Sequence, residues 1–71
     1  SDELRAFGAE LQALVQRALA RIERARIGLQ QANNDLLRTQ QLAQQGFVAP
    51  TRLDADALAV KAAQRELDAA V

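Results

Sequence analysis

The chain has 71 residues, with nine basic and nine acidic side chains and neither cysteine nor histidine. The missing cysteine and histidine exclude a disulfide framework and the commonest zinc ligands. A formal net charge of zero argues against a nucleic-acid binder, which needs a basic face. Hydrophobic residues make up 49% of the chain and are mostly Ala and Leu, a composition typical of coiled coils.

Residues 2–45 are predicted to form one long helix, because they contain no proline and only two glycines, Gly8 and Gly28. Apolar residues recur in steps of three and four, as in a heptad coiled coil, with one extra step of four between Leu14 and Ile22. This apolar seam consists of Leu4, Phe7, Leu11, Leu14, Ala18, Ile22, Ala25, Leu29, Ala32, Leu36, Thr39 and Ala43. A helix of this length needs a neighbour to cover its seam.

A turn is predicted at about residues 46–50. Gly46 suits the left-handed conformation that often follows a helix end. Phe47 then lies where a residue can fold back on Leu42 in a Schellman-type contact. Gly46 and Pro50 are therefore the residues expected to shape the turn.

A second helix is predicted from about residue 51 to residue 71, with the seam Leu53, Ala57, Val60, Gln64, Leu67 and Val71. Two starting points remain open. Ala49 could be the N-cap with Pro50 in the first turn, or Thr51 could be the N-cap with Asp54 completing a capping box. In both cases Asp54 and Asp56 lie near the positive end of the helix dipole.

The two seams match when the chain folds back near residue 48. In an antiparallel hairpin, paired residue numbers add up to a constant, and one constant fits every seam position of the second helix. The predicted pairs are Leu53 with Ala43, Ala57 with Thr39, Val60 with Leu36, Gln64 with Ala32, Leu67 with Leu29 and Val71 with Ala25. The sequence therefore predicts an all-α fold, a long antiparallel two-helix coiled-coil hairpin that forms a single unit over residues 1–71.

Residues 1–24 have no partner in this hairpin, although they carry a long apolar stripe. We therefore expect the chain to be a fragment of a larger protein, in which a continuation of the second helix covers residues 1–24. In isolation the chain is expected to self-associate through this stripe.

No group of residues suggests catalysis. Asp54 and Asp56 are two positions apart and so point to different sides of a helix, and nothing resembles a phosphate loop, a nucleophile elbow or a metal cluster. Arg17, Arg21 and Arg24 form a basic strip, which is either a solvated face or a lateral contact between protomers. The chain is therefore not expected to be an enzyme or to bind a cofactor or metal.

The stretch from Asp35 to Asp54 resembles the hairpin tip of periplasmic adaptor proteins, also called membrane fusion proteins, of the HlyD-like secretion protein family. The family's tip motif is an Arg, a Leu four residues later, and a Ser or Thr seven residues further on. Arg38 and Leu42 match the first two positions. Ala49 occupies the third, and Thr51 lies two residues beyond it.

The resemblance implies a helical hairpin that links an inner-membrane transporter to a TolC-like outer-membrane channel in efflux or type I secretion. It implies a periplasmic location, inner-membrane anchoring through regions outside this chain, insertion of the hairpin in a β-rich lipoyl-like domain, and a tube of neighbouring protomers. The residues implied to bind the channel are Arg38, Leu42, Phe47, Ala49 and Thr51.

Other interpretations stay open. Arg38 could simply pair with Asp35, and Leu42 could serve mainly to pack against Phe47. For the whole chain, the alternatives are a coiled-coil arm of a cytoplasmic protein and a self-associating helical oligomerisation module.

Overall fold

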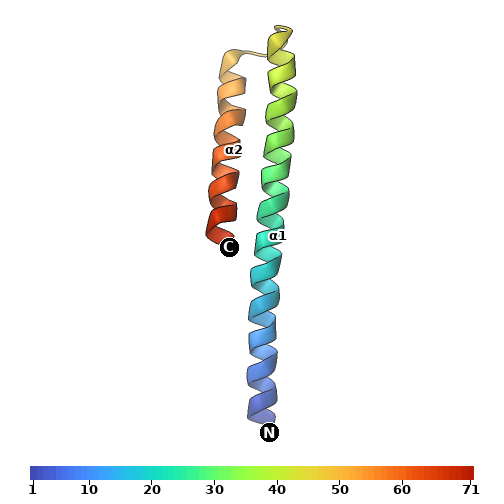
Figure 1. The fold of residues 1–71 in the computed structure, drawn as a ribbon, viewed down its shortest axis with the longest axis vertical. Helices are drawn as coiled ribbons and strands as arrows, with labels where there is room; N and C mark the ends of the chain where they lie inside the picture. Colours follow the sequence, from blue (N-terminus) through green and yellow to red (C-terminus); the bar gives the residue numbers. More distant parts are fainter.

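The computed structural model describes all residues, 1–71, as two helices joined by one short loop (Figure 1). Helix α1 spans Asp2–Gln44 and helix α2 spans Pro50–Ala70. The molecule is a rod measuring 67 × 14 × 11 Å. The predicted all-α helical hairpin is confirmed, and α1 ends and α2 begins one residue earlier than the sequence suggested.

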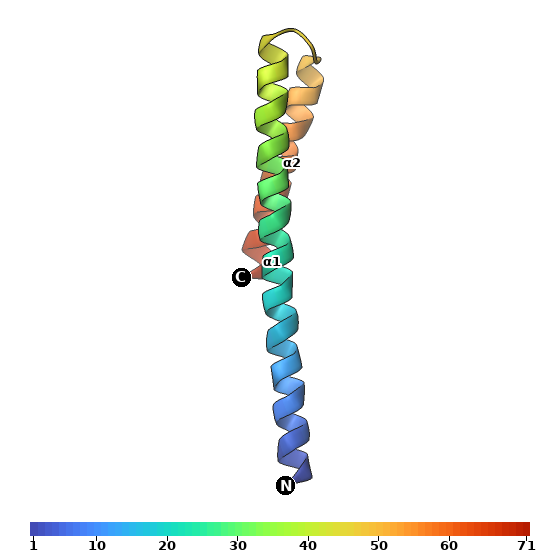
Figure 2. The same cartoon turned by 90° about the vertical axis from the view of Figure 1, so that its right-hand side faces the viewer.

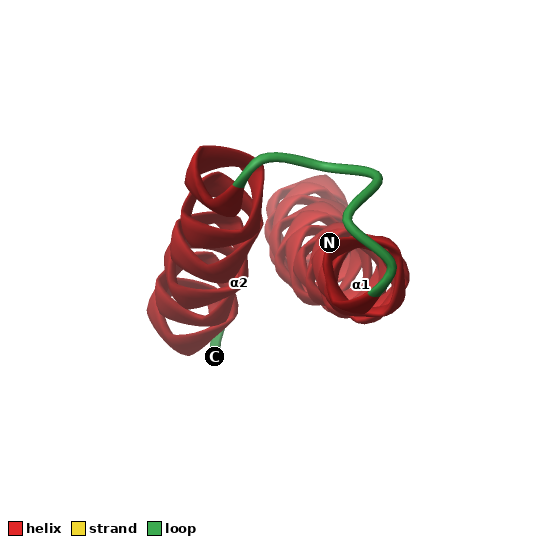
Figure 3. Ribbon diagram, turned by 90° about the horizontal axis from the view of Figure 1, so that it is seen from above, coloured by secondary structure: helices red, strands yellow, loops and turns green.

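The helices are unequal in length, and this sets the shape of the molecule. Figures 1 and 2 show α2 running back from the loop beside the upper half of α1, while the N-terminal half of α1 continues alone. Seen from the loop end, the two helices lie side by side and the loop crosses between them (Figure 3). Neither helix is long and apolar enough over its length to cross a membrane.

The α1 helix ends in a Schellman motif. The Phe47 N–H donates to the Leu42 carbonyl at 2.9 Å, and the Gly46 N–H donates to the Ala43 carbonyl at 3.0 Å. Gly46 has a φ of 76°, the left-handed conformation that glycine adopts without steric cost. The expected backbone turn is therefore present, but the Phe47 ring stays 71% exposed rather than packing away on Leu42.

The α2 helix begins with Ala49 as its N-cap and Pro50 as its first residue, which decides between the two starting points. Ala49 is extended, with φ −72° and ψ 150°, and no side chain caps the helix. Its carbonyl accepts a hydrogen bond from the Arg52 N–H at 3.0 Å. Thr51 therefore lies inside the first turn, and the alternative capping box with Asp54 is not formed.

The interface between the helices is thin, because only Ala25 and Thr39 are buried. Around them, the half-buried residues of the paired region are Ile22, Gly28, Leu29, Ala32, Leu36, Leu42 and Ala43 on α1, and Leu53, Asp56, Ala57, Val60, Ala63, Leu67 and Ala70 on α2. Six of these fourteen residues are Ala or Gly and six are Leu or Ile, and none of the large side chains is fully buried, so the interface buries little apolar area.

The predicted seam of α2 is wrong at two positions. Gln64 and Val71 are exposed, and their neighbours Ala63 and Ala70 are half-buried instead. After Val60 the half-buried residues follow in steps of three, four and three, whereas the predicted seam continued in steps of four, three and four.

The predicted pairing of the helices is approximately met near the tip, where Thr39 bonds to Asp56, the neighbour of its predicted partner Ala57, and Ala43 and its predicted partner Leu53 line one groove. The predicted pairing fails at the other end of the paired region. It placed Leu67 beside Leu29, and so Glu66 near Gln30, whereas the Glu66 carboxylate lies 3.9 Å from the Arg21 guanidinium. Because α1 continues past the level at which α2 begins, α2 lies closer to the N-terminus of α1 than a symmetrical bend would place it (Figure 1).

Replacing Gly46 with Ala tests the turn. An Ala at a φ of 76° should destabilise the hairpin by about 1–2 kcal/mol, because its Cβ clashes in the left-handed region. Thermal unfolding followed by far-UV circular dichroism measures this change. Gly28→Ala is the matched control, since no heavy atom lies within 4 Å of a Cβ built there, and it should stabilise α1 by up to about 1 kcal/mol. A Gly46→Ala variant as stable as the wild type would contradict the left-handed conformation of Gly46 in the turn.

Candidate partner-binding tip

The tip consists of the last turns of α1, the loop at residues 45–49 and the first turn of α2 (Figure 2). Of the residues that the sequence assigned to it, Phe47, Ala49 and Thr51 are exposed in or next to the loop, and Leu42 is half-buried at the end of α1. These four residues are therefore brought to one end of the rod.

Arg38 lies further down α1 and points into solvent, with a side chain that is 68% exposed. Its Nη1 atom lies 3.4 Å from Oδ1 of Asp35, one turn earlier on the same helix. This is the pair expected from the alternative interpretation, in which Arg38 simply pairs with Asp35. An exposed ion pair of this kind contributes little to stability. The guanidinium thus remains free to exchange Asp35 for a carboxylate or carbonyl of a partner.

Sequence reasoning missed a shallow groove between the helices near the tip. It is lined by Gln40, Ala43 and Gln44 of α1 and by Leu53 of α2. The two glutamines are one turn apart on α1, so their amides share one edge of the groove. Each amide can both donate and accept a hydrogen bond, which suits recognition of a partner's backbone. The signal in the sequence was the run of glutamines just before Gly46.

The sequence interpretation also missed a polar contact between the helices. Thr39 was assigned to the apolar seam and Asp56 to the helix dipole, but the Thr39 hydroxyl donates to Oδ2 of Asp56 at 2.5 Å. Neither Asp54 nor Asp56 lies in the first turn of α2. Oδ1 of Asp56 also lies 3.3 Å from Nε of Arg52, one turn earlier. This contact joins the helices just below the tip.

The environment of Asp56 lowers the pKa of its carboxyl group. The largest cause is the hydrogen bond from Thr39, and the hydrogen bond and charge of Arg52 act in the same direction. Partial burial of the carboxylate, which is 15% exposed, opposes them by raising the pKa. The ionised form is therefore the one that the folded hairpin favours.

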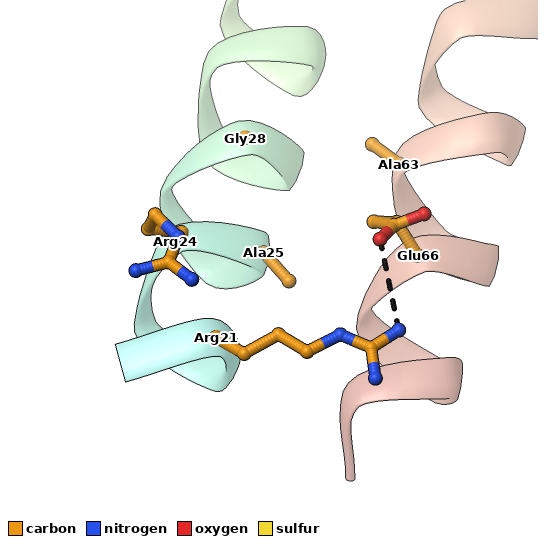
Figure 4. A pocket seen from close by; sticks show the side chains of 6 residues that line it. All are labelled: Arg21, Arg24, Ala25, Gly28, Ala63 and Glu66. Atoms are coloured by element: carbon orange, nitrogen blue, oxygen red, sulfur yellow. Dashed lines mark ion pairs between the residues drawn. The ribbon is translucent and has the colours of Figure 1, made fainter. Parts of the chain in front are cut away.

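A second groove lies at the far end of the paired region (Figure 4). Arg21 extends across it from α1, and its Nη2 atom lies 3.9 Å from Oε1 of Glu66 on α2. Ala25, Gly28 and Ala63 line the floor, where their small size leaves space between the helices. Of the predicted basic strip, Arg21 is therefore the member that joins the two helices.

These grooves contain no arrangement suited to nucleophilic or acid–base chemistry. No group of three or more acidic, histidine or cysteine side chains that could hold a metal ion occurs in the structure. The tip presents an exposed aromatic ring and an exposed guanidinium, side-chain types that are enriched at protein interfaces, together with two amides.

Comparison of the chain with models of protein families, with curated proteins and with solved structures found no match. The assignment of the tip therefore depends on its own residues and on their arrangement.

Replacing Thr39 with Val tests the contact between Thr39 and Asp56. Folding lowers the pKa of Asp56 below its ordinary value of 3.8, so the ionised carboxylate stabilises the folded hairpin at pH values above 3.8. This stabilisation is lost as the pH falls through the lowered pKa of the folded state. Thr39→Val should therefore lower the melting temperature at pH ~7, and its difference from the wild type should shrink by pH ~2, as Asp56 becomes protonated.

Thermal melts across this pH range measure the effect, and Thr51→Val, at an exposed threonine, is the control. A difference between Thr39→Val and wild type that stays constant at every pH would show that Thr39 stabilises the hairpin without involving the Asp56 charge.

Proposed function

We propose that this chain is the helical hairpin of a periplasmic adaptor, or membrane fusion, protein of the HlyD-like type, linking an inner-membrane transporter to an outer-membrane channel in efflux or type I secretion. The observation that carries the proposal is the tip. A narrow rod closes in a single turn that holds Phe47 in solvent, with Arg38 exposed below it on α1.

In this proposal the two helices act as a spacer and the tip binds the channel. Phe47 supplies apolar contact area that the fold itself does not use, because its ring is 71% exposed. Arg38 supplies a planar group that can form two parallel hydrogen bonds to a carboxylate. Aromatic and arginine side chains are the types that most often dominate binding energy at protein interfaces.

The tip departs from the family's motif at Ala49, which has no hydroxyl group. Thr51 lies exposed in the first turn of α2 and provides the nearest hydroxyl in the sequence. The proposal therefore assigns to Thr51 the hydrogen bond that the motif's Ser or Thr would make, and it expects an outer-membrane channel of TolC-like type as the partner.

A second candidate function is helical self-association. It is favoured by the apolar side chains that α2 leaves uncovered on the N-terminal half of α1. The two functions use opposite ends of the rod, so they can be tested separately.

Binding of the chain to a purified TolC-like channel in detergent, measured on a sensor surface, tests the tip. Arg38→Asp should weaken binding by about tenfold or more, the effect expected when an arginine central to an interface is lost. Arg65→Asp is the matched control, because Arg65 is exposed on α2 away from the tip. Circular dichroism should show equal helicity for both variants. Equal binding by Arg38→Asp and wild type would refute the role of Arg38.

A further inference from the structure

An apolar stripe runs along the half of α1 that α2 does not cover. The paired region ends near Arg21, which reaches Glu66, and Ile22, which is half-buried. Beyond this point the large apolar side chains are all at least half exposed: Leu4 at 71%, Phe7 at 64%, Leu11 at 51%, Leu14 at 58%, Val15 at 51% and Leu19 at 60%. Soluble proteins rarely leave so continuous an apolar stripe in water.

The two edges of this stripe differ in character. One edge carries charged residues at intervals of seven, acidic at Glu3 and Glu10 and basic at Arg17. The other edge carries Gly8 and Val15 at the same interval. When Leu4 is placed at position a of the heptad, the charged edge occupies the g positions and the uncharged edge occupies the e positions. The residues at g and e decide how a partner helix is oriented.

The edges select an antiparallel partner with the same sequence. In a parallel pair of helices, g positions face e positions, so the charged edge of each copy would face Gly8 and Val15 of the other. In an antiparallel pair, g faces g and e faces e. The charged edges then meet each other, and so do the uncharged edges.

We propose that a second copy of this chain covers the stripe, packed antiparallel so that Leu4 contacts Leu14 of the second copy and Phe7 contacts Leu11 of the second copy. The two copies are related by a two-fold axis, so each contact occurs twice. Glu3 then lies beside Arg17 of the second copy, with opposite charges. Gly8 faces Gly8 of the second copy, where the missing side chains let the backbones approach.

This arrangement fits beside α2. Glu3 lies near the start of the second copy's helix and is placed beside Arg17. The second copy therefore ends before the level of Arg21, where the region paired with α2 ends. The second copy and α2 can therefore occupy the same face of α1 one after the other. One contact is unfavourable, because the two Glu10 carboxylates meet at the two-fold axis with like charges.

Analytical ultracentrifugation of the whole chain tests whether the dimer forms. The wild type should sediment as a dimer at micromolar concentration, and Leu11→Asp should be a monomer with reduced helicity. Leu37→Asp is the matched control, since Leu37 is also exposed on α1 but lies outside the stripe, and it should remain dimeric. A wild type that sediments as a monomer would overturn the proposal and would leave the stripe to a continuation of α2 or to another partner. Dissociation of the dimer by Leu37→Asp to the same extent as by Leu11→Asp would also overturn it.

Disulfide trapping tests the orientation, because the chain has no cysteine of its own. Mixing Leu4→Cys with Leu14→Cys should give a cross-linked pair containing one of each variant, and Leu4→Cys alone should cross-link poorly. Efficient cross-linking of Leu4→Cys to itself would show a parallel pair and overturn the antiparallel arrangement.

The charges give an independent check. Glu10→Gln should tighten the dimer several-fold, and Glu3→Arg should weaken it. No change in dimer affinity for either variant would contradict the arrangement. Arg38 lies outside the stripe, so failure of the dimer would leave the proposed tip function standing, and failure of channel binding would leave the dimer standing.

Discussion

The packing of α2 against the upper half of α1 is the contact on which the rest of the structure depends. It is thin, with only Ala25 and Thr39 buried, so it supplies little of the hydrophobic stabilisation that a globular core would give. Apolar contacts are also non-directional, so by themselves they specify the relative position of two helices only weakly. The Thr39–Asp56 hydrogen bond near the tip is the directional contact between the helices, whereas the Arg21–Glu66 ion pair at the other end is exposed on both sides and adds little.

The division of α1 into a covered and an uncovered half explains why this small chain offers two separate surfaces. At the covered end, the Schellman turn at Gly46 fixes where α1 stops and holds Phe47 in solvent. At the uncovered end, the same apolar seam continues to Leu4 with nothing from this chain beside it. The proposed channel binding uses the first surface, and the proposed dimer uses the second. Neither requires the rod to change shape.

Local chemistry made the helices and the turn predictable from the sequence. Gly46 and Pro50 mark the ends of the helices, and the steps of three and four identify the face of α1 that is covered. The relation between the helices was less predictable. The predicted alternation of steps beyond Val60 selected Gln64 and Val71, although Ala63 and Ala70 are the half-buried residues. A threonine in an apolar seam also gave no sign that its hydroxyl would bond to Asp56. The exposure of Phe47 likewise depends on the path of the loop, which the sequence pattern does not specify.

A distance between spin labels tests the packing of the two helices most directly. The chain lacks cysteine, so labels can be attached at Gln31→Cys and Lys61→Cys, two exposed positions on facing stretches of α1 and α2. With unlabelled protein added to suppress signals between copies, the hairpin predicts a separation of about 20 Å, because packed helices lie ~8–10 Å apart and the labels extend outward. A separation on the order of 45 Å, the value for an unbroken helix rising ~1.5 Å per residue, would contradict the hairpin.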